Sequence, residues 1–364
     1  MVRVLHLLNA QADLQTRRGV EQLTPSAGAP WTAQTRTIGR GGDWRNAAIA
    51  LLGMRRPLHD GIDICHAWGA SALAVATLAG APRIVYTPCT YPTSQSLRWL
   101  RAAMAYRDVQ VICPTATQRR VFIEHGVELT HCHLIRPGVD FSRVRGRRNP
   151  ELRQSLGIDP DDHVVLLPGE TTRESEHQLG LTVVSLLHVL DPHWRVLLWG
   201  RGPRASALLR FESRLEQSRF LVCPEQRPGP APEFESLLPA ADMALVTMRR
   251  SATTLDIAMC MAAALPIVAL AYPTNSELLE DRHTALLTGP GPLRILARRL
   301  LDAQENESLR WAIADLARTE AFEYFSQRRF VEQYASAYAQ LAAGAAVDLP
   351  PPAPGAGLRF HGRA

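Results

Sequence analysis

The stretch that decides the fold is Arg195–Pro203, RVLLWGRGP, an apolar run that ends in two glycines and a proline. We expect a buried strand over Arg195–Trp199, then a turn at the glycines, then a helix. The run HVVLLPG at His163–Gly169 has the same form. Apolar strands that each end in a glycine turn before a helix are typical of parallel sheets covered by helices.

Similar units alternate along the whole chain. In the first half the expected strands are Val2–Leu8, Ala33–Ile38, Ile62–His66, Arg83–Thr87, Val109–Cys113 and His133–Ile135. The expected helices there are Asp43–Met54, Ser71–Leu78, Ser96–Tyr106 and Thr115–His125. The second series of strands is His163–Leu167, Arg195–Trp199, Phe220–Cys223, Met243–Val246, Ile267–Leu270 and Thr284–Leu287. The pattern predicts an α/β protein with two doubly wound parallel sheets.

The two series are separated by Arg143–Pro150, a basic stretch with glycine and proline that suits a linker. We therefore expect one domain over residues 1–145 and a second over 146–320. The chain is expected to be helical from Trp311 to about Leu341, and proline-rich residues 346–364 are expected to be disordered. Ligands of such sheets bind at the carboxyl ends of the strands, so the expected site is a cleft between the domains.

Composition excludes several classes of function. The 364 residues are 46% apolar and 21% charged, which is typical of a soluble globular protein. All 40 basic residues are arginine, so lysine Schiff-base chemistry, pyridoxal-phosphate chemistry and a P-loop are excluded. A net charge of +5 and 6% aromatic residues predict no nucleic-acid partner.

The cysteines and the apolar runs indicate a cytoplasmic protein. Six scattered cysteines without a CxxC pair are typical of reduced thiols, and zinc-ligand spacing is absent, so no metal is expected. The longest apolar stretch, Ile257–Tyr272, is shorter than the roughly 18–20 residues that span a bilayer, and Pro266 divides it. We expect no transmembrane segment, and a peripheral membrane contact stays open.

Six motifs occur in a fixed order between about Cys65 and Tyr338. They are Arg136–Asp140, Leu167–Gly169, Leu198–Pro203, Ala262–Ala269, Ser276–Asp281, and Phe325-Ser326 with Tyr334. Together they resemble a retaining GT-B glycosyltransferase of the family-four (glycosyl transferases group 1) kind. The resemblance implies an N-terminal acceptor-side domain and a C-terminal donor-side domain, both Rossmann-like. It also implies that a helix over 321–345 crosses back to the N-terminal domain.

The resemblance implies transfer of a sugar from a nucleotide-sugar to an unidentified glycan, lipid or small-molecule acceptor, without a cofactor. The family binds the donor diphosphate with an Arg and a Lys in the first C-domain loop. Here those positions are Glu170 and Ser175. A carboxylate repels a diphosphate. Arg173, between them, either supplies a compensating cation or is a solvated loop arginine.

The family's two donor-site glutamates fall at Ser251 and Met259. The Met259 sulfur is a weak acceptor that cannot hold a ribose diol, so packing in a helix is the alternative. Ser251 either binds one hydroxyl or caps the next helix. Thr253 and Thr254, at that helix start, offer backbone N–H groups that can bind phosphate.

Other site positions match the family pattern. Gly169, Gly202 and the acid Glu277 lie where the resemblance implies contacts with the donor. In the N-terminal domain, Cys89 takes the place of the family's His near the reacting carbon. His66 matches another family His, with a core histidine as the alternative reading.

Three functions therefore compete. The first is a glycosyltransferase. The second is a catalytically silent GT-B protein that acts as a partner or regulatory subunit, because the charged donor-site residues are mostly replaced. The third is an NAD(P)-dependent enzyme that uses the GxGxxA turn at Gly200–Ala205, with Glu225 as the ribose acid.

Overall fold

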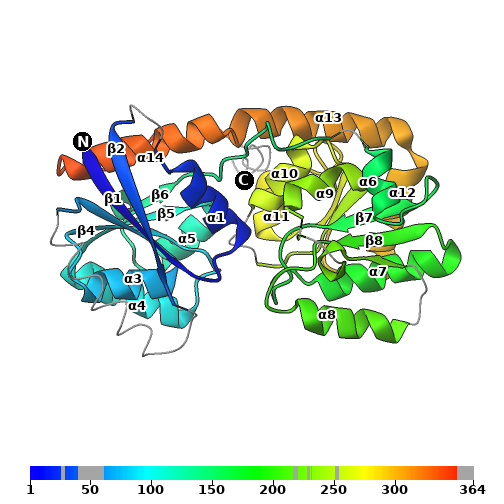
Figure 1. Cartoon of the computed structure of the whole chain (residues 1–364), viewed down its shortest axis with the longest axis horizontal. Helices are drawn as coiled ribbons and strands as arrows, with labels where there is room; N and C mark the ends of the chain where they lie inside the picture. The colour runs from blue at the N-terminus through cyan, green and yellow to red at the C-terminus, as the bar shows by residue number, and fades with distance from the viewer. Residues whose placement is uncertain are drawn as a thin grey trace. The chain divides into compact units, whose positions relative to one another are not determined.

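The computed structural model describes residues 1–25, 29–39, 61–146, 148–215, 220–227, 230, 232–250 and 254–350. The chain divides into two compact units, which Figure 1 shows with labelled elements. The first contains Thr254 and the described residues of Met1–Gly138 and Gln327–Pro352, and the second contains those of Val139–Ser251 and Leu255–Ser326.

The first unit is built on a six-stranded parallel sheet of order β2-β1-β3-β4-β5-β6. Its strands are β1 (Val2–Asn9), β2 (Trp31–Ile38), β3 (Ile64–Trp68), β4 (Arg83–Thr87), β5 (Asp108–Cys113) and β6 (Cys132–Leu134). In the register of the sheet, Val4 lies opposite both Ala33 and Ile64. Helices cover both faces, which explains why β3 is buried along its whole length.

Two hydrophobic cores lie on the two faces of this sheet. One core involves α3 (Ala70–Leu78), α4 (Ser94–Tyr106) and α5 (Ala116–Glu124). The other involves α1 (Leu14–Gln22) and α14 (Gln327–Ala342). Helix α14 contacts β1 and β3, so a segment from late in the sequence completes a sheet made of early strands.

The second unit has its own six-stranded parallel sheet, of order β12-β11-β10-β7-β8-β9. Its strands are β7 (His163–Leu167), β8 (Trp194–Leu198), β9 (Leu221–Val222), β10 (Met243–Val246), β11 (Ile267–Leu270) and β12 (Leu286–Thr288). All pairs of neighbouring strands are parallel.

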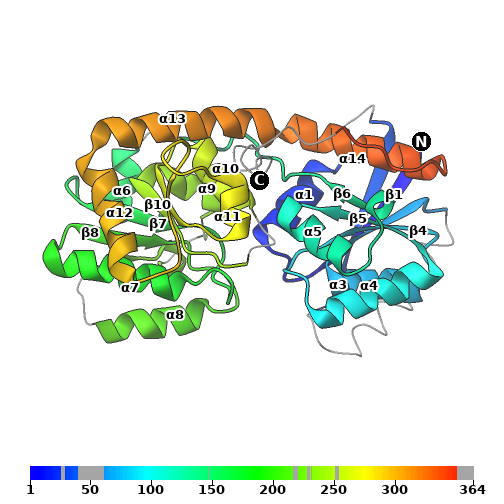
Figure 2. The same ribbon diagram turned by 180° about the vertical axis from the view of Figure 1, so that it is seen from behind.

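Helices also cover this second sheet. On one side α7 (His177–Leu190), α8 (Ala205–Glu212) and α12 (Leu293–Glu305) share a hydrophobic core with the strands, and Figures 1 and 2 both place α12 beside α7. Helices α10 (Leu255–Ala262) and α13 (Glu307–Tyr324) contact each other. The shorter helices are α6 (Pro150–Ser155), α9 (Phe234–Leu237) and α11 (Pro273–Leu278). Short 3-10 turns lie at Leu129–His131, Ser213–Leu215, Pro224–Gln226 and Leu238–Ala240.

The predicted α/β class with two parallel sheets is confirmed, and β4, β7, β10 and β11 have the expected bounds. The expected helical segment from Trp311 to about Leu341 is present as two helices, α13 and α14. The chain breaks between α13 and α14, where the Phe325 carbonyl accepts a hydrogen bond from the Val139 N–H. The division between the units lies at Gly138 rather than residue 145. The expected helix Asp43–Met54 and most of the expected tail lie outside the described residues.

Candidate functional site

The candidate site lies where the second sheet reverses its direction of winding. The chain runs from β7 outward through β8 to β9, and then returns to β10 on the other side of β7. Ligands of doubly wound sheets bind at the carboxyl ends of the strands beside such a point. Two segments begin there: residues 168–176 after β7, here called the β7 loop, and residues 247–250 after β10, the β10 loop.

Hydrogen bonds join the two loops. The Thr247 hydroxyl donates to the Ser175 carbonyl at 2.7 Å, and the Arg249 N–H donates to the Glu174 carbonyl at 3.1 Å. The two loops therefore form one platform at the switch point.

The base of the platform leaves no room for a side chain at Gly169. This residue has φ +81°, and a Cβ there would collide with the carboxylate of Asp256 in the first turn of α10. Asp256 is 5% exposed. A buried carboxylate thus lies directly behind the loop, a feature that sequence reasoning missed because helix α10 reads as uniformly apolar apart from this residue.

The glycine turn after β8 packs against the β7 loop. Gly202 has φ +119°, and a Cβ there would lie 2.6 Å from the Thr171 backbone N and O atoms. The Thr171 N–H donates to the Arg201 carbonyl at 2.6 Å, and the Arg204 N–H donates to the Thr171 carbonyl at 3.0 Å. Only a glycine permits this approach, so the Gly-x-Gly-Pro turn here serves to fix the β7 loop.

Ser175 serves the loop itself. Its hydroxyl donates to the Thr172 carbonyl at 3.0 Å and accepts from the Thr172 N–H at 3.1 Å, and the residue is 2% exposed. The hydroxyl is therefore occupied within the loop.

A buried histidine braces the loop from below. His177 Nε2 is 3.0 Å from the Pro168 carbonyl and Nδ1 is 3.3 Å from the Thr171 hydroxyl, so the neutral ring donates from Nε2. Burial lowers the pKa of His177 to about 4. Sequence reasoning missed this residue, because nothing in the pattern distinguishes it from an exposed histidine at a helix start.

Arginines surround the platform. Arg173 is exposed on the β7 loop, and Arg249 and Arg250 are exposed on the β10 loop. Within the described part of the chain, the guanidinium groups of Arg173 and Arg249 make no ion pair. Of these, only Arg173 stands close in sequence to Glu170, which is half-buried. The pair Arg249-Arg250 was missed, although two arginines directly after an apolar strand are a readable signal.

A pocket of about 460 Å³ opens beside the β7 loop, between the first turns of α7 and α8. Arg173 and Arg204 line it, together with Thr172, Glu176 and an apolar floor that includes Leu208. Its size is in the range of small-molecule sites.

The other positions that were expected to contact a donor, where the structure describes them, are buried. Met259 is 2% exposed within α10, Thr254 is fully buried just before it, and Glu277 is 6% exposed in α11. Ser251 and Thr253 lie outside the described residues. Met259 therefore presents no polar group to a ligand.

Asn275 in α11 is a further site residue that the sequence did not reveal. Its side-chain amide donates to the Met248 and Leu270 carbonyls, both at 2.9 Å. Its Oδ1 atom is buried and accepts no hydrogen bond from the described residues. Asn275 thus ties the β10 loop to the end of β11 and leaves one buried acceptor unused.

In the first unit, His66 is a packed core residue. Nδ1 lies 2.6 Å from the Tyr338 hydroxyl, Nε2 lies 2.9 Å from the Thr87 hydroxyl, and the ring stacks on Trp68 at 4.2 Å. Burial and then neighbouring His6 lower the pKa of His66 well below its ordinary value. Both ring nitrogens are engaged, so none is available to a substrate.

Cys89 lies at the carboxyl end of β4. Its Sγ accepts a hydrogen bond from the Thr16 hydroxyl at 3.0 Å. Burial, and then the nearby Asp13 carboxylate, raise the pKa of the Cys89 thiol. The thiol is therefore protonated and a poor nucleophile. Asp13 and Thr16, at the start of α1, were not singled out from the sequence.

Among the residues described here, no group of three or more His, Cys, Asp or Glu side chains could hold a metal ion. No helix in the same part of the chain is long and apolar enough to cross a membrane.

Part of the second unit is similar to a known protein family. Residues 162–306 match the model of the family described as glycosyl transferases group 1. This segment holds both loops, helix α10 and the glycine turn. A search of curated protein sequences finds no match to this chain.

Solved structures resemble the whole chain. The structure of Anabaena HepE in complex with UDP-glucose matches with a TM-score of 0.75 at 17% identity. The match covers 94% of this chain and 100% of the HepE chain. Sucrose-phosphate synthase from Thermosynechococcus elongatus has a TM-score of 0.77 at 15% identity, with the same coverages of 94% and 100%. A glycosyltransferase from Rickettsia africae has a TM-score of 0.71 at 13% identity and covers 93% and 98%. The fold is that of the GT-B glycosyltransferases.

Proposed function

We propose that this protein is a glycosyltransferase that moves a sugar from a nucleotide-sugar donor to an acceptor, with retention of stereochemistry. The observation that carries the proposal is that the segment matching the glycosyl transferases group 1 family contains the switch-point platform. The similar HepE structure is a complex with UDP-glucose, which makes a nucleoside diphosphate-sugar the first donor to test. The donor is a substrate, and no cofactor is proposed.

The leaving diphosphate needs positive charge. The family supplies this charge from an Arg and a Lys, whose positions are taken by Glu170 and Ser175 in this chain. Arg173, Arg249 and Arg250 are exposed on the two bonded loops and can replace it. Guanidinium groups bind phosphate oxygens through paired, charge-assisted hydrogen bonds. We assign diphosphate binding to these arginines.

A second candidate function is a catalytically silent GT-B protein that serves as a partner or regulatory subunit. Two carboxylates favour it: Glu170 on the β7 loop, and buried Asp256 behind Gly169. Ser175 also has its hydroxyl engaged within the loop. The NAD(P) alternative has no such support, since Glu225 is paired with Arg201 at 3.3 Å.

A thermal-shift screen of the whole protein tests these alternatives. The ligands are UDP, GDP, ADP, their glucose conjugates, and NAD(P). A ligand at a hundred times its Kd stabilises by about 2.7 kcal/mol, which the assay detects. Stabilisation by one diphosphate, followed by release of that diphosphate from its sugar conjugate, supports the glycosyltransferase. Binding without turnover, or no response, supports the silent protein, and a response to NAD(P) alone overturns both.

Variants locate the binding. Arg249→Ala and Arg173→Ala should each weaken diphosphate binding by about 1–2 kcal/mol and reduce its salt dependence. Arg210→Ala is the matched control, because Arg210 is exposed further along α8. Equal losses in all three variants would indicate general electrostatics instead of a site.

A further inference from the structure

A second pocket opens at the opposite edge of the second sheet, where its strands begin. Its volume is about 510 Å³, within the range of ligand sites. It is lined by residues at the start of four strands: Asp162 and His163 at β7, His193 at β8, Asp242 at β10 and Pro266 at β11. Parallel strands start at one edge, so this pocket is separate from the switch-point platform.

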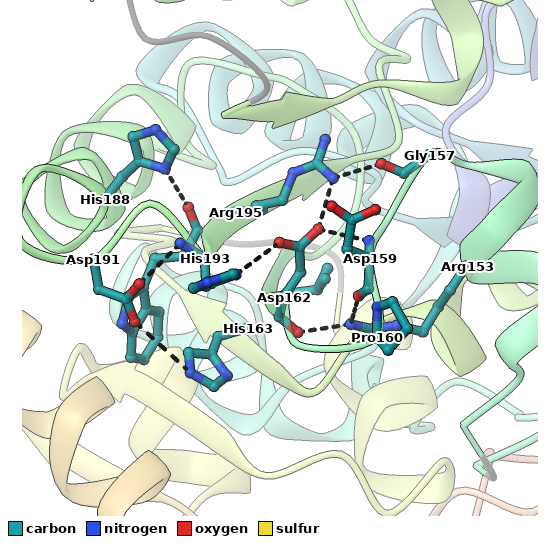
Figure 3. A network of polar contacts seen from close by, with 12 residues as sticks. Arg153, Gly157, Asp159, Pro160, Asp162, His163, His188, Asp191, His193 and Arg195 are labelled. Atoms are coloured by element: carbon teal, nitrogen blue, oxygen red, sulfur yellow. Dashed lines mark hydrogen bonds and ion pairs between the residues drawn. The ribbon is translucent and has the colours of Figure 1, made fainter.

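A polar network holds one wall of this pocket in place (Figure 3). The Asp162 carboxylate accepts from Arg195 at 2.8 Å and lies 3.6 Å from His193 Nδ1. His163 lies 3.9 Å from the Asp191 carboxylate. Its Nδ1 is 3.1 Å from the Gln304 amide nitrogen. The network orients both imidazoles before any ligand arrives.

Part of this wall remains available for hydrogen bonds. The His193 side chain is 56% exposed, and only its Nδ1 faces Asp162. Asp161 is exposed and makes no ion pair or side-chain hydrogen bond with the described residues. This rim therefore offers a carboxylate at Asp161 and an imidazole nitrogen at His193.

An aromatic residue forms the other side. Trp311 is 55% exposed, unusual for so large an apolar side chain. Its indole N–H donates to Glu307 at 3.2 Å, and Arg310 lies over the ring at 5.7 Å. The one polar atom of the indole already has a partner, so its exposed part is carbon surface.

The charges of the lining are balanced. Asp162 is paired with Arg195 at 2.8 Å, and Asp242 is paired with Arg153 at 3.0 Å and with Arg148 at 3.7 Å. Of the lining residues that carry a permanent charge, Asp161 and Arg310 remain, one of each sign. Neither a phosphate nor a polycation therefore meets an excess of opposite charge, which favours a neutral ligand.

We propose that this pocket binds a neutral saccharide. A pyranose ring has one face of C–H groups and a rim of hydroxyls that both donate and accept. The C–H face matches the Trp311 surface, since an aromatic face is electron-rich and attracts such hydrogens. The hydroxyl rim matches the carboxylate of Asp161 and the imidazole of His193. The site goes beyond the proposed transfer reaction, because it would hold a glycan away from the donor platform.

Saturation-transfer NMR and isothermal titration on the whole protein test this proposal. The probes are neutral trisaccharides of glucose, galactose, mannose and N-acetylglucosamine, with inorganic phosphate and spermidine as charged comparisons. We expect at least one trisaccharide to bind, and Trp311→Ala to weaken it about tenfold or more. His193→Ala should weaken the same binding. Trp99→Ala is the matched control, because Trp99 is 46% exposed in the first unit.

Each other outcome overturns the proposal. If no trisaccharide binds at about 10 mM, the pocket is not a saccharide site. Binding that survives Trp311→Ala but is lost in Arg249→Ala places the saccharide at the donor platform. Phosphate or spermidine binding that alone depends on Trp311 assigns the pocket to a charged ligand.

Discussion

His66 Nδ1 and the Tyr338 hydroxyl lie 2.6 Å apart, although 272 residues separate them in the sequence. Both residues are fully or almost fully buried, at 0% and 1% exposure. The contact joins β3 to α14 within the first unit. A buried hydrogen bond of this kind specifies where a helix sits on a sheet, because any shift leaves a polar atom without a partner.

Tyr338→Phe should destabilise the first unit by about 1–3 kcal/mol, since it leaves a buried imidazole nitrogen unpaired while removing little volume. Urea denaturation measures the change in the free energy of unfolding. Limited proteolysis of the chain beyond α14 reports whether this helix is held less firmly. Tyr106→Phe is the control, because Tyr106 is 80% exposed. Equal stabilities of the two variants would show that the 2.6 Å contact contributes nothing.

His177 makes the stability of the second unit depend on pH. Burial lowers its folded-state pKa to about 4, against an ordinary value of 6.5. Between pH 4 and 6.5 the unfolded chain binds the extra proton, so the free energy of unfolding rises with pH across that window. Above about pH 6.5 His177 is neutral in both the folded and the unfolded chain. The free energy of unfolding is then about 3 kcal/mol higher than below pH 4.

The His177 contribution is measured by denaturation at several pH values for wild type and His177→Gln. The variant should show a shallower slope between pH 4 and 6.5. His125→Gln, at an exposed histidine, should retain the wild-type slope. A His177→Gln slope identical to wild type would contradict the assignment.

Glu170→Arg should tighten nucleoside diphosphate binding by about 1–3 kcal/mol, because it replaces a repulsive charge with a phosphate-binding one. Titration with UDP at one salt concentration measures it. Glu174→Arg is the control, because it makes the same charge change at an exposed position of the same loop. Unchanged or weaker binding by Glu170→Arg would mean that this carboxylate points away from the phosphates.

Ala264→Gly should stabilise the second unit by about 0.5–1 kcal/mol. Ala264 has φ +52°, a left-handed conformation that costs an alanine energy and a glycine none. Ala263→Gly, one residue earlier and fully buried, should instead be destabilising. Thermal midpoints of the two variants should therefore move in opposite directions.

Much of the fold could be predicted because parallel strands are buried on both faces. Runs such as His163–Leu167 and Met243–Val246 are almost wholly apolar and are flanked by polar or turn residues, so even their bounds were correct. Helix α1 was missed because its buried face includes Gln15, Thr16 and Gly19, which gives no apolar periodicity.

The site was less predictable than the fold. A family pattern assigns positions but not the direction of a side chain, so Ser175 was a candidate ligand although its hydroxyl bonds within the loop. The Asp256–Gly169 contact depends on how a helix packs behind a loop. Spacing in the sequence carries no information about such packing between distant segments.

The contact of α14 with the first sheet has a consequence for biosynthesis. The sheet face that carries Ile64 and Trp68 packs against Tyr334 and Tyr338, which the ribosome adds more than half a chain later. The described core of the second unit lies within 139–326 and is already synthesised by then. Domains generally fold as units during synthesis. Here the half that leaves the ribosome first must wait for its last helix, so the domain translated second is the first to be completed.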